Sequence, residues 1–277
     1  MICTRLALPV SFLLVSLTLP SIGQTSDDSR KESFVPPMQT QSQVSNPTAN
    51  PGERQITDEE KGDLYMARKQ YREAMDQYRL LCQQDPHNAV YLNKLGIALH
   101  QQTALGLALK YYERAVKVNP KYADAENNIG TIWYQRKKYG KAVRAYQRAI
   151  KMRDDMPVLY SNLGYAYFSE GKYDDSIAAF RMALAKDPQF FERGSSRNGS
   201  VLQDRSVPDR GRFYFLLAKS FAQAGNLERA ILYLRKSKEE GYAQFNDVKK
   251  DPVFAVLLND PVIIDLLTPK PVEAAQQ

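Results

Sequence analysis

The stretch PVLYSNLGYAYFSEGKYDDSIAAFRMALAKDPQF, residues 157–190, is one copy of a unit that recurs every 34 residues. Proline marks one phase of this period at Pro86, Pro120 and Pro188, and Asp154 stands where the step before Pro188 would place a proline. A fixed period of this length is typical of stacked helical hairpins, which act by presenting a surface to other molecules.

Small and large residues alternate at fixed phases of the same period. The two clearest sets are the glycines Gly62, Gly96, Gly130 and Gly164 and the rings Tyr78, Tyr112, Tyr146 and Phe180. A glycine inside a helix costs about 0.5–1 kcal/mol relative to alanine, so a recurrent one needs a reason. We expect close helix contact, in which a neighbouring ring fills the space that a side chain would occupy.

Apolar residues recur at spacings of three and four within each unit, which predicts two amphipathic helices per copy. In residues 89–122 the matching positions are Leu92, Leu95, Gly96, Leu99, Ala108, Tyr112, Ala115 and Pro120. With these residues the chain resembles the tetratricopeptide repeat family. The resemblance implies an all-α fold, a right-handed α-solenoid of helix-turn-helix repeats.

The period divides the chain into segments. About five repeats are expected at 55–88, 89–122, 123–156, 157–190 and 211–244, and an inserted surface loop at 191–210 interrupts the count before the fifth. Two short helices within 251–268, each preceded by Asp-Pro, are expected to cap the array, because Asp before Pro is typical of a helix start. Residues 269–277 are expected to be a disordered tail.

The N-terminus has the pattern of a secretory signal peptide. Arg5 precedes an apolar run from Leu6 to Leu19, and small residues at Ser21 and Gly23 suit cleavage after Gly23. A helical run of that length covers about 21 Å, less than the roughly 30 Å core of a bilayer, so no transmembrane span is expected in the mature chain. Residues 24–54, rich in Ser, Thr, Gln, Asn and Pro, predict a disordered polar linker. The protein is therefore expected to be exported, to the periplasm of a bacterium or to the exterior.

Enzyme signatures are missing from the sequence. His87 and His100 are its only histidines, and neither a metal-ligand spacing, a phosphate-binding glycine loop nor a serine elbow occurs. Loss of residues 1–23 would remove Cys3 and leave Cys82 alone, so no intramolecular disulfide is expected and Cys82 is interpreted as a buried apolar residue. We therefore expect no catalytic residues, no metal and no cofactor.

Basic residues gather in the third repeat. From Asn127 to Arg153 the chain has eight Lys or Arg and no Asp or Glu. The expected basic stripe is Lys137, Lys138, Lys141, Arg144, Arg148 and Lys151. It is either a solvated outer face or a surface for an anionic partner such as an acidic protein or a phospholipid surface. Nucleic acid is disfavoured by export and by the lack of interleaved aromatic residues for base stacking.

The family resemblance also implies a partner groove, lined by fixed positions of the first helix of each repeat. Here these positions hold Asn93, Lys94, Ile97, His100, Asn127, Asn128, Thr131, Tyr134, Ser161, Asn162, Tyr165 and Phe168. Asn128 and Asn162 stand where relatives often have an asparagine that grips a peptide backbone, because an amide both donates and accepts hydrogen bonds. A basic clamp for a C-terminal carboxylate is not clearly reproduced, since Lys94 and Lys219 are the only nearby cations.

These observations favour an exported, non-enzymatic scaffold that binds a protein or peptide partner in the cell envelope through this groove. The first alternative is a binder of an anionic surface or acidic partner through the basic stripe within Arg136–Arg153. The second is an envelope enzyme accessory, or an enzyme with an unrecognised site.

Overall fold

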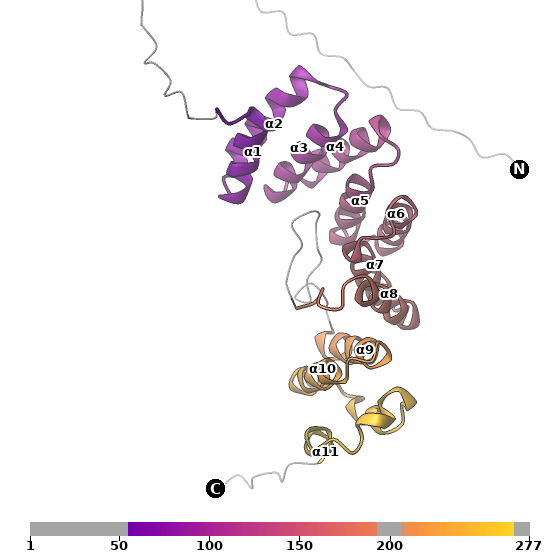
Figure 1. Ribbon diagram of the computed structural model, residues 1–277. Helices are drawn as coiled ribbons and strands as arrows, with labels where there is room; N and C mark the ends of the chain where they lie inside the picture. Colours follow the sequence, from indigo (N-terminus) through magenta and orange to yellow (C-terminus); the bar gives the residue numbers. More distant parts are fainter. Residues whose placement is uncertain (1–54, 193–206, 208, 269–277) are drawn as a thin grey trace, which may run out of the picture. The chain divides into compact units, whose positions relative to one another are not determined.

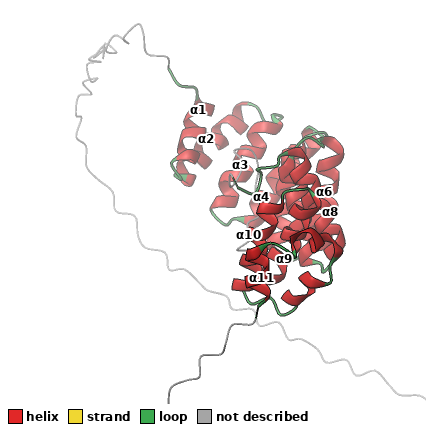
Figure 2. Ribbon diagram, turned by 60° about the horizontal axis from the view of Figure 1, so that its bottom comes forward, coloured by secondary structure: helices red, strands yellow, loops and turns green. Residues whose placement is uncertain are grey.

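The structure is a computed structural model that describes residues 55–192, 207 and 209–268. The expected signal peptide 1–23, linker 24–54 and tail 269–277 lie outside the described residues, as does most of the expected loop 191–210. Within the described part the secondary structure is helical, and Figure 2 shows helices joined by loops and no strand there.

Ten α-helices follow one another as antiparallel pairs along the array (Figure 1). They are α1 (Asp58–Ala67), α2 (Tyr71–Gln84), α3 (Ala89–Gln101), α4 (Leu105–Val118), α5 (Ala123–Gln135), α6 (Tyr139–Met152), α7 (Pro157–Ser169), α8 (Tyr173–Lys186), α9 (Arg210–Gln223) and α10 (Leu227–Glu239). Each helix packs on its partner, and the second helix of each of the first four pairs packs on the first helix of the next pair. This arrangement is the α-solenoid that the 34-residue period predicts.

Glycine and a ring meet inside each of the first four pairs. A Cβ atom built on Gly130 of α5 would lie 2.5 Å from Cε1 of Tyr146 in α6, and the same distance separates Gly62 from Tyr78, Gly96 from Tyr112 and Gly164 from Phe180. All four rings are buried. The prediction that a ring fills the space beside each glycine is therefore confirmed, and this contact sets how closely the two helices approach.

The fifth pair is joined to the fourth by aromatic packing and by an ion pair. Phe213 of α9 is buried against Phe180, with ring centroids 5.7 Å apart and nearly perpendicular planes. Arg229 of α10 pairs with Glu192, which follows α8, at 2.7 Å. The pair α9 and α10 therefore continues the array beyond the insertion.

Short helices close the C-terminal end of the array. They are η2 (Phe245–Lys249), η3 (Pro252–Leu257) and α11 (Pro261–Leu267). Asp251 and Asp260 cap η3 and α11 by accepting hydrogen bonds from the backbone N–H groups of Val253 and Val262, at 3.0 and 2.8 Å. Phe254 and Ile263 are fully buried, as expected of a cap that covers the last hairpin.

One expectation about the core needs correction. Cys82 in α2 is half-buried and not buried as predicted. Burial of its thiol is still sufficient to raise its pKa to about 11, with a smaller opposing effect of Arg114. The thiol is therefore protonated and poorly reactive near neutral pH.

The glycine–ring contact predicts opposite effects for two alanine substitutions. Gly130→Ala should lower the free energy of unfolding by about 1–3 kcal/mol, because its Cβ overlaps the buried ring of Tyr146. Gly106→Ala in α4 is the matched control, since its Cβ would meet nothing closer than Arg136 at 3.8 Å. It should raise stability by a few tenths to about 1 kcal/mol. Urea unfolding followed by circular dichroism measures both, and equal effects would contradict this explanation of the glycine phase.

Candidate partner-binding groove

The expected groove residues lie on three consecutive first helices, α3, α5 and α7. Their accessibility differs along the array. All of those on α5 and α7 are buried, as is Asn93 on α3, whereas Lys94, Ile97 and His100 on α3 keep partial exposure. The accessible part of the predicted groove is therefore its N-terminal part.

Amide hydrogen bonds between neighbouring first helices account for the buried asparagines. Asn128 donates from Nδ2 to Oδ1 of Asn93 at 3.0 Å, and Asn162 donates in the same way to Asn127 at 2.8 Å. In each bond the partners are 35 residues apart, one period plus one residue. Buried amides need such partners, because an unpaired polar group costs about 1–3 kcal/mol. The amides that were expected to hydrogen-bond the backbone of a peptide thus join one repeat to the next.

The same 35-residue step recurs in two further contacts. His100 Nε2 lies 3.0 Å from Oε1 of Gln135, and the Tyr134 hydroxyl lies 3.0 Å from Oγ of Ser169. Burial lowers the pKa of His100 below its usual value, so its imidazole is uncharged at neutral pH. With its proton on Nε2, His100 donates to Oε1 of Gln135. Its Nδ1 then accepts a hydrogen bond from the Tyr112 hydroxyl, 3.4 Å away.

Two aromatic residues of the predicted groove, Tyr165 and Phe168, are covered by the fifth repeat. The ring of Tyr165 is stacked on Phe213 of α9, with centroids 5.1 Å apart and planes at 18°. Phe168 meets the same ring edge to face at 5.6 Å. These two side chains contribute to the core between α7 and α9, which explains their burial.

Ser161 differs from the other buried polar residues of α7. Its side chain is fully buried, and Oγ forms no hydrogen bond in the described part of the chain. Replacement by a group of similar size without a hydroxyl should therefore be tolerated at this position.

Both cations near the groove are neutralised by acidic residues. Lys94 Nζ lies 2.7 Å from Glu59 and 2.7 Å from Asp63, both on α1. Burial opposes the charge of Lys94, but the hydrogen bonds to Asp63 and Glu59 outweigh burial and raise its pKa. Lys219 pairs with Asp251 at 2.6 Å. Neither lysine is thus available as a simple counter-ion for a carboxylate.

The basic stripe lies on α6 and on the turn before it. Lys137, Lys138, Lys141, Arg144, Arg148 and Lys151 are all exposed. Arg148 also forms an ion pair with Glu126, whose side chain is only 4% exposed. Glu126 stands one residue before the acid-free stretch, so the sequence pattern did not reveal this pairing. Arg148 is therefore a structural residue as well as a surface charge.

Across residues 55–192, 207 and 209–268 no group of three His, Cys, Asp or Glu side chains could hold a metal ion. Among the same residues no helix is long and apolar enough to cross a membrane.

Family models and solved structures resemble this chain. Models described as tetratricopeptide repeat match residues 157–190 and residues 93–157 and 199–243, and a further model described as TPR repeat matches 62–102. No curated protein sequence matches the chain.

Two of the similar solved structures are of proteins named MamA. A crystal structure of MamA is 22% identical, with coverage of 67% of this chain and 96% of its own and a TM-score of 0.46. A structure of MamA from Desulfovibrio magneticus RS-1, residue 41 to the end, is 16% identical, with coverage of 68% and 94% and a TM-score of 0.47.

The amide bonds between repeats predict that Asn128→Ala destabilises the fold. The substitution leaves the buried Oδ1 of Asn93 without its donor, so the free energy of unfolding should fall by about 1–3 kcal/mol. Asn246→Ala in η2, where the side chain is exposed, should change it by less than about 0.5 kcal/mol. Equal stability of the two variants in urea would contradict a structural role for the Asn128 amide.

Proposed function

Because the chain belongs to the tetratricopeptide repeat family, we propose that it is a non-enzymatic scaffold that binds a protein or peptide partner through α1 and α3. Repeats of this family form a scaffold for protein interaction. The choice of surface follows from accessibility, since the predicted groove on α5 and α7 is buried by contacts between repeats.

A strip of accessible side chains on α3 carries the proposal. Val90, Lys94, Ile97 and Gln101 follow one another at spacings of four, three and four, which places them on one face of the helix. Val90 is 41% exposed and Gln101 is exposed, while Lys94 and Ile97 are partly exposed. We call these four residues the α3 strip.

The chemistry of the α3 strip suits a polypeptide. Val90 and Ile97 offer apolar contact, and Lys94 with its acidic partners Glu59 and Asp63 offers polar contacts between them. Interfaces of this kind gain most of their affinity from a few apolar anchors, surrounded by polar groups that add specificity. Asp63 remains exposed beside Lys94, so a basic residue of the partner has a counter-ion there.

Substitution at the exposed edge of the α3 strip tests the proposal. Val90→Lys should reduce capture of the partner from an envelope extract by about fivefold or more, because it places a charge at an apolar contact. Val118→Lys is the matched control, since Val118 in α4 is exposed to a similar extent, 37%. Mature chain, residues 24–277, serves as bait for quantitative mass spectrometry. Undiminished capture by Val90→Lys would contradict the proposal.

A second candidate function is supported by the basic face of α6. Lys141, Arg144 and Lys151 are exposed on a helix without an acidic residue, which suits an anionic surface or an acidic partner. Binding of this kind should weaken steeply with salt and with Arg144→Glu combined with Lys151→Glu. Arg148 is left unchanged in that variant, because its loss would strand the buried Glu126. If capture of the partner depended on Arg144 and Lys151 and not on Val90, binding through the basic face of α6 would replace binding through the α3 strip as the proposed function.

We also propose that the protein is exported. Arg5, the apolar run Leu6 to Leu19 and the small residues at Ser21 and Gly23 support this proposal. N-terminal sequencing of the chain recovered from the producing cell tests it. A mature chain beginning at Gln24 would support export, and an intact N-terminus on cytoplasmic protein would contradict it.

A further inference from the structure

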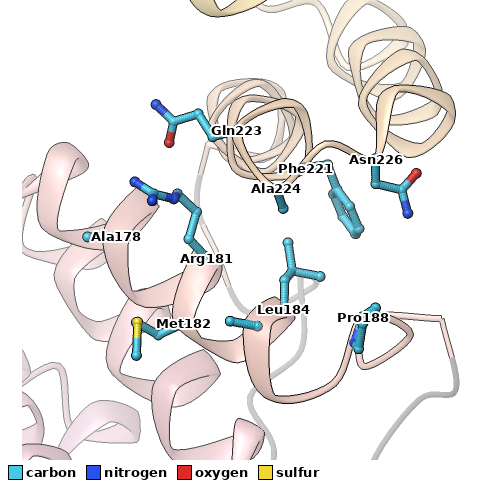
Figure 3. A pocket seen from close by; sticks show the side chains of 10 residues that line it. Ala178, Arg181, Met182, Leu184, Pro188, Phe221, Gln223, Ala224 and Asn226 are labelled. Atoms are coloured by element: carbon cyan, nitrogen blue, oxygen red, sulfur yellow. The ribbon is translucent and has the colours of Figure 1, made fainter.

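A pocket lies between α8 and the turn that joins α9 to α10, away from the α3 strip. Its volume is about 470 Å³. Figure 3 shows Leu184, Phe221 and Ala224 in the middle of the pocket, with Arg181 and Gln223 at one side and Asn226 at the other. Pockets for small ligands have this character, with about 300–1,000 Å³ of mostly apolar space and a few polar groups.

The repeat period explains why the space is open at this junction. Positions 178, 185 and 224 hold alanine here and line the pocket. The corresponding residues at the three preceding junctions are all longer and polar or charged: Asp76, Gln83 and Gln102; Lys110, Lys117 and Arg136; Arg144, Lys151 and Glu170. Alanine at three positions of this junction leaves space that longer side chains can occupy at the three preceding junctions.

A hydrogen bond that spans the preceding junction has no counterpart here. Gln147 of α6 donates from Nε2 to the Tyr167 hydroxyl of α7 at 2.9 Å. At the junction of α8 and α9, Arg181 stands in the place of Gln147 and Phe221 in the place of Tyr167. Phe221 has no hydroxyl, so the bond cannot form and its ring presents an apolar surface to the pocket.

The polar groups around the pocket favour an anionic ligand. Arg181 is exposed, and no hydrogen bond or ion pair joins it to another residue in the described part of the chain. Asn226, at the edge of the pocket, accepts a hydrogen bond from the backbone N–H of Arg229 at 3.1 Å through Oδ1, which leaves its Nδ2 as a donor. A guanidinium beside an apolar floor matches a carboxylate attached to an apolar group, because its paired N–H groups fit both carboxylate oxygens.

We propose that this pocket binds a small amphiphilic carboxylate. The apolar body of the ligand lies on Leu184 and Phe221, and its carboxylate pairs with Arg181. Arg181 is the cation among the described lining residues, so a ligand with a single negative charge fits better than a phosphate with two. The site is independent of the α3 strip, and each can be tested without the other.

Decanoate is the probe for this site, at concentrations below those at which it forms micelles. It should bind the mature chain in isothermal titration calorimetry and shift the methyl resonance of Met182, which lines the pocket. Decan-1-ol, with the same chain and no charge, should bind about tenfold more weakly, because the charge-assisted hydrogen bonds to Arg181 are lost.

Variants taken from the other repeats provide the matched tests. Arg181→Gln introduces the residue of the third copy and should weaken decanoate binding about tenfold. Ala185→Gln combined with Ala224→Gln introduces the residues of the first junction, Gln83 and Gln102, fills the pocket without adding charge and should abolish binding. Lys110→Gln, at the junction between α4 and α5, should leave binding unchanged, and circular dichroism confirms that each variant is folded.

Any of four results would overturn the proposal. The first three are the absence of decanoate binding to the mature chain, equal affinity for decanoate and decan-1-ol, and undiminished decanoate binding by the folded Ala185→Gln and Ala224→Gln double variant. A Met182 resonance that stays unshifted while heat is released would place the ligand elsewhere and overturn it as well.

Discussion

The array depends on one contact, a buried ring seated against a helical glycine in each of the first four repeats. No side chain larger than hydrogen fits between Gly130 and Tyr146, or at the three equivalent pairs. Because the contact recurs with the period, successive hairpins have the same internal spacing and their first helices come to lie side by side. The amide bonds Asn93–Asn128 and Asn127–Asn162 follow from that arrangement, since each joins the same two phases of neighbouring copies.

The sequence predicted those features that repeat. These features are the contacts between glycines and rings, the helix pairs, and the Asp-Pro caps of η3 and α11. Each follows from a local or periodic sequence pattern, and the chain contains several examples of each pattern. Contacts between neighbouring helices were harder to predict. Asn128 could equally have faced a ligand or another repeat, and the buried Glu126 that pairs with Arg148 lies just outside the basic stretch. The pocket had a signal, three alanines at phases that otherwise hold long side chains. This signal spans the insertion, because Ala178 and Ala185 lie on α8 and Ala224 follows α9.

Contacts between repeats also decide which surfaces remain for partners. On α5 and α7 the residues that the family resemblance assigns to a groove are used for cohesion of the array, through amide pairs and the packing of Tyr165 on Phe213. On α3 the equivalent face stays partly open, and its lysine is balanced by acids from α1. Departures from the repeat consensus thus leave two distinct accessible sites, the α3 strip and the pocket beside Arg181. The regular part of the array holds these sites in place.

Thiol labelling compares the accessibility of the two parts of the groove directly. Cys82 provides a low background in a chain of residues 24–277, because burial raises the pKa of its thiol to about 11. Val90→Cys in the α3 strip places a thiol beside the open part of the groove, and Ser161→Cys on α7 places one in the closed part. We predict that the thiol at position 90 reacts with a maleimide at least about tenfold faster than the one at position 161, which requires local opening. Equal rates would show that the groove on α7 is open, and would contradict the account of a groove closed by contacts between repeats.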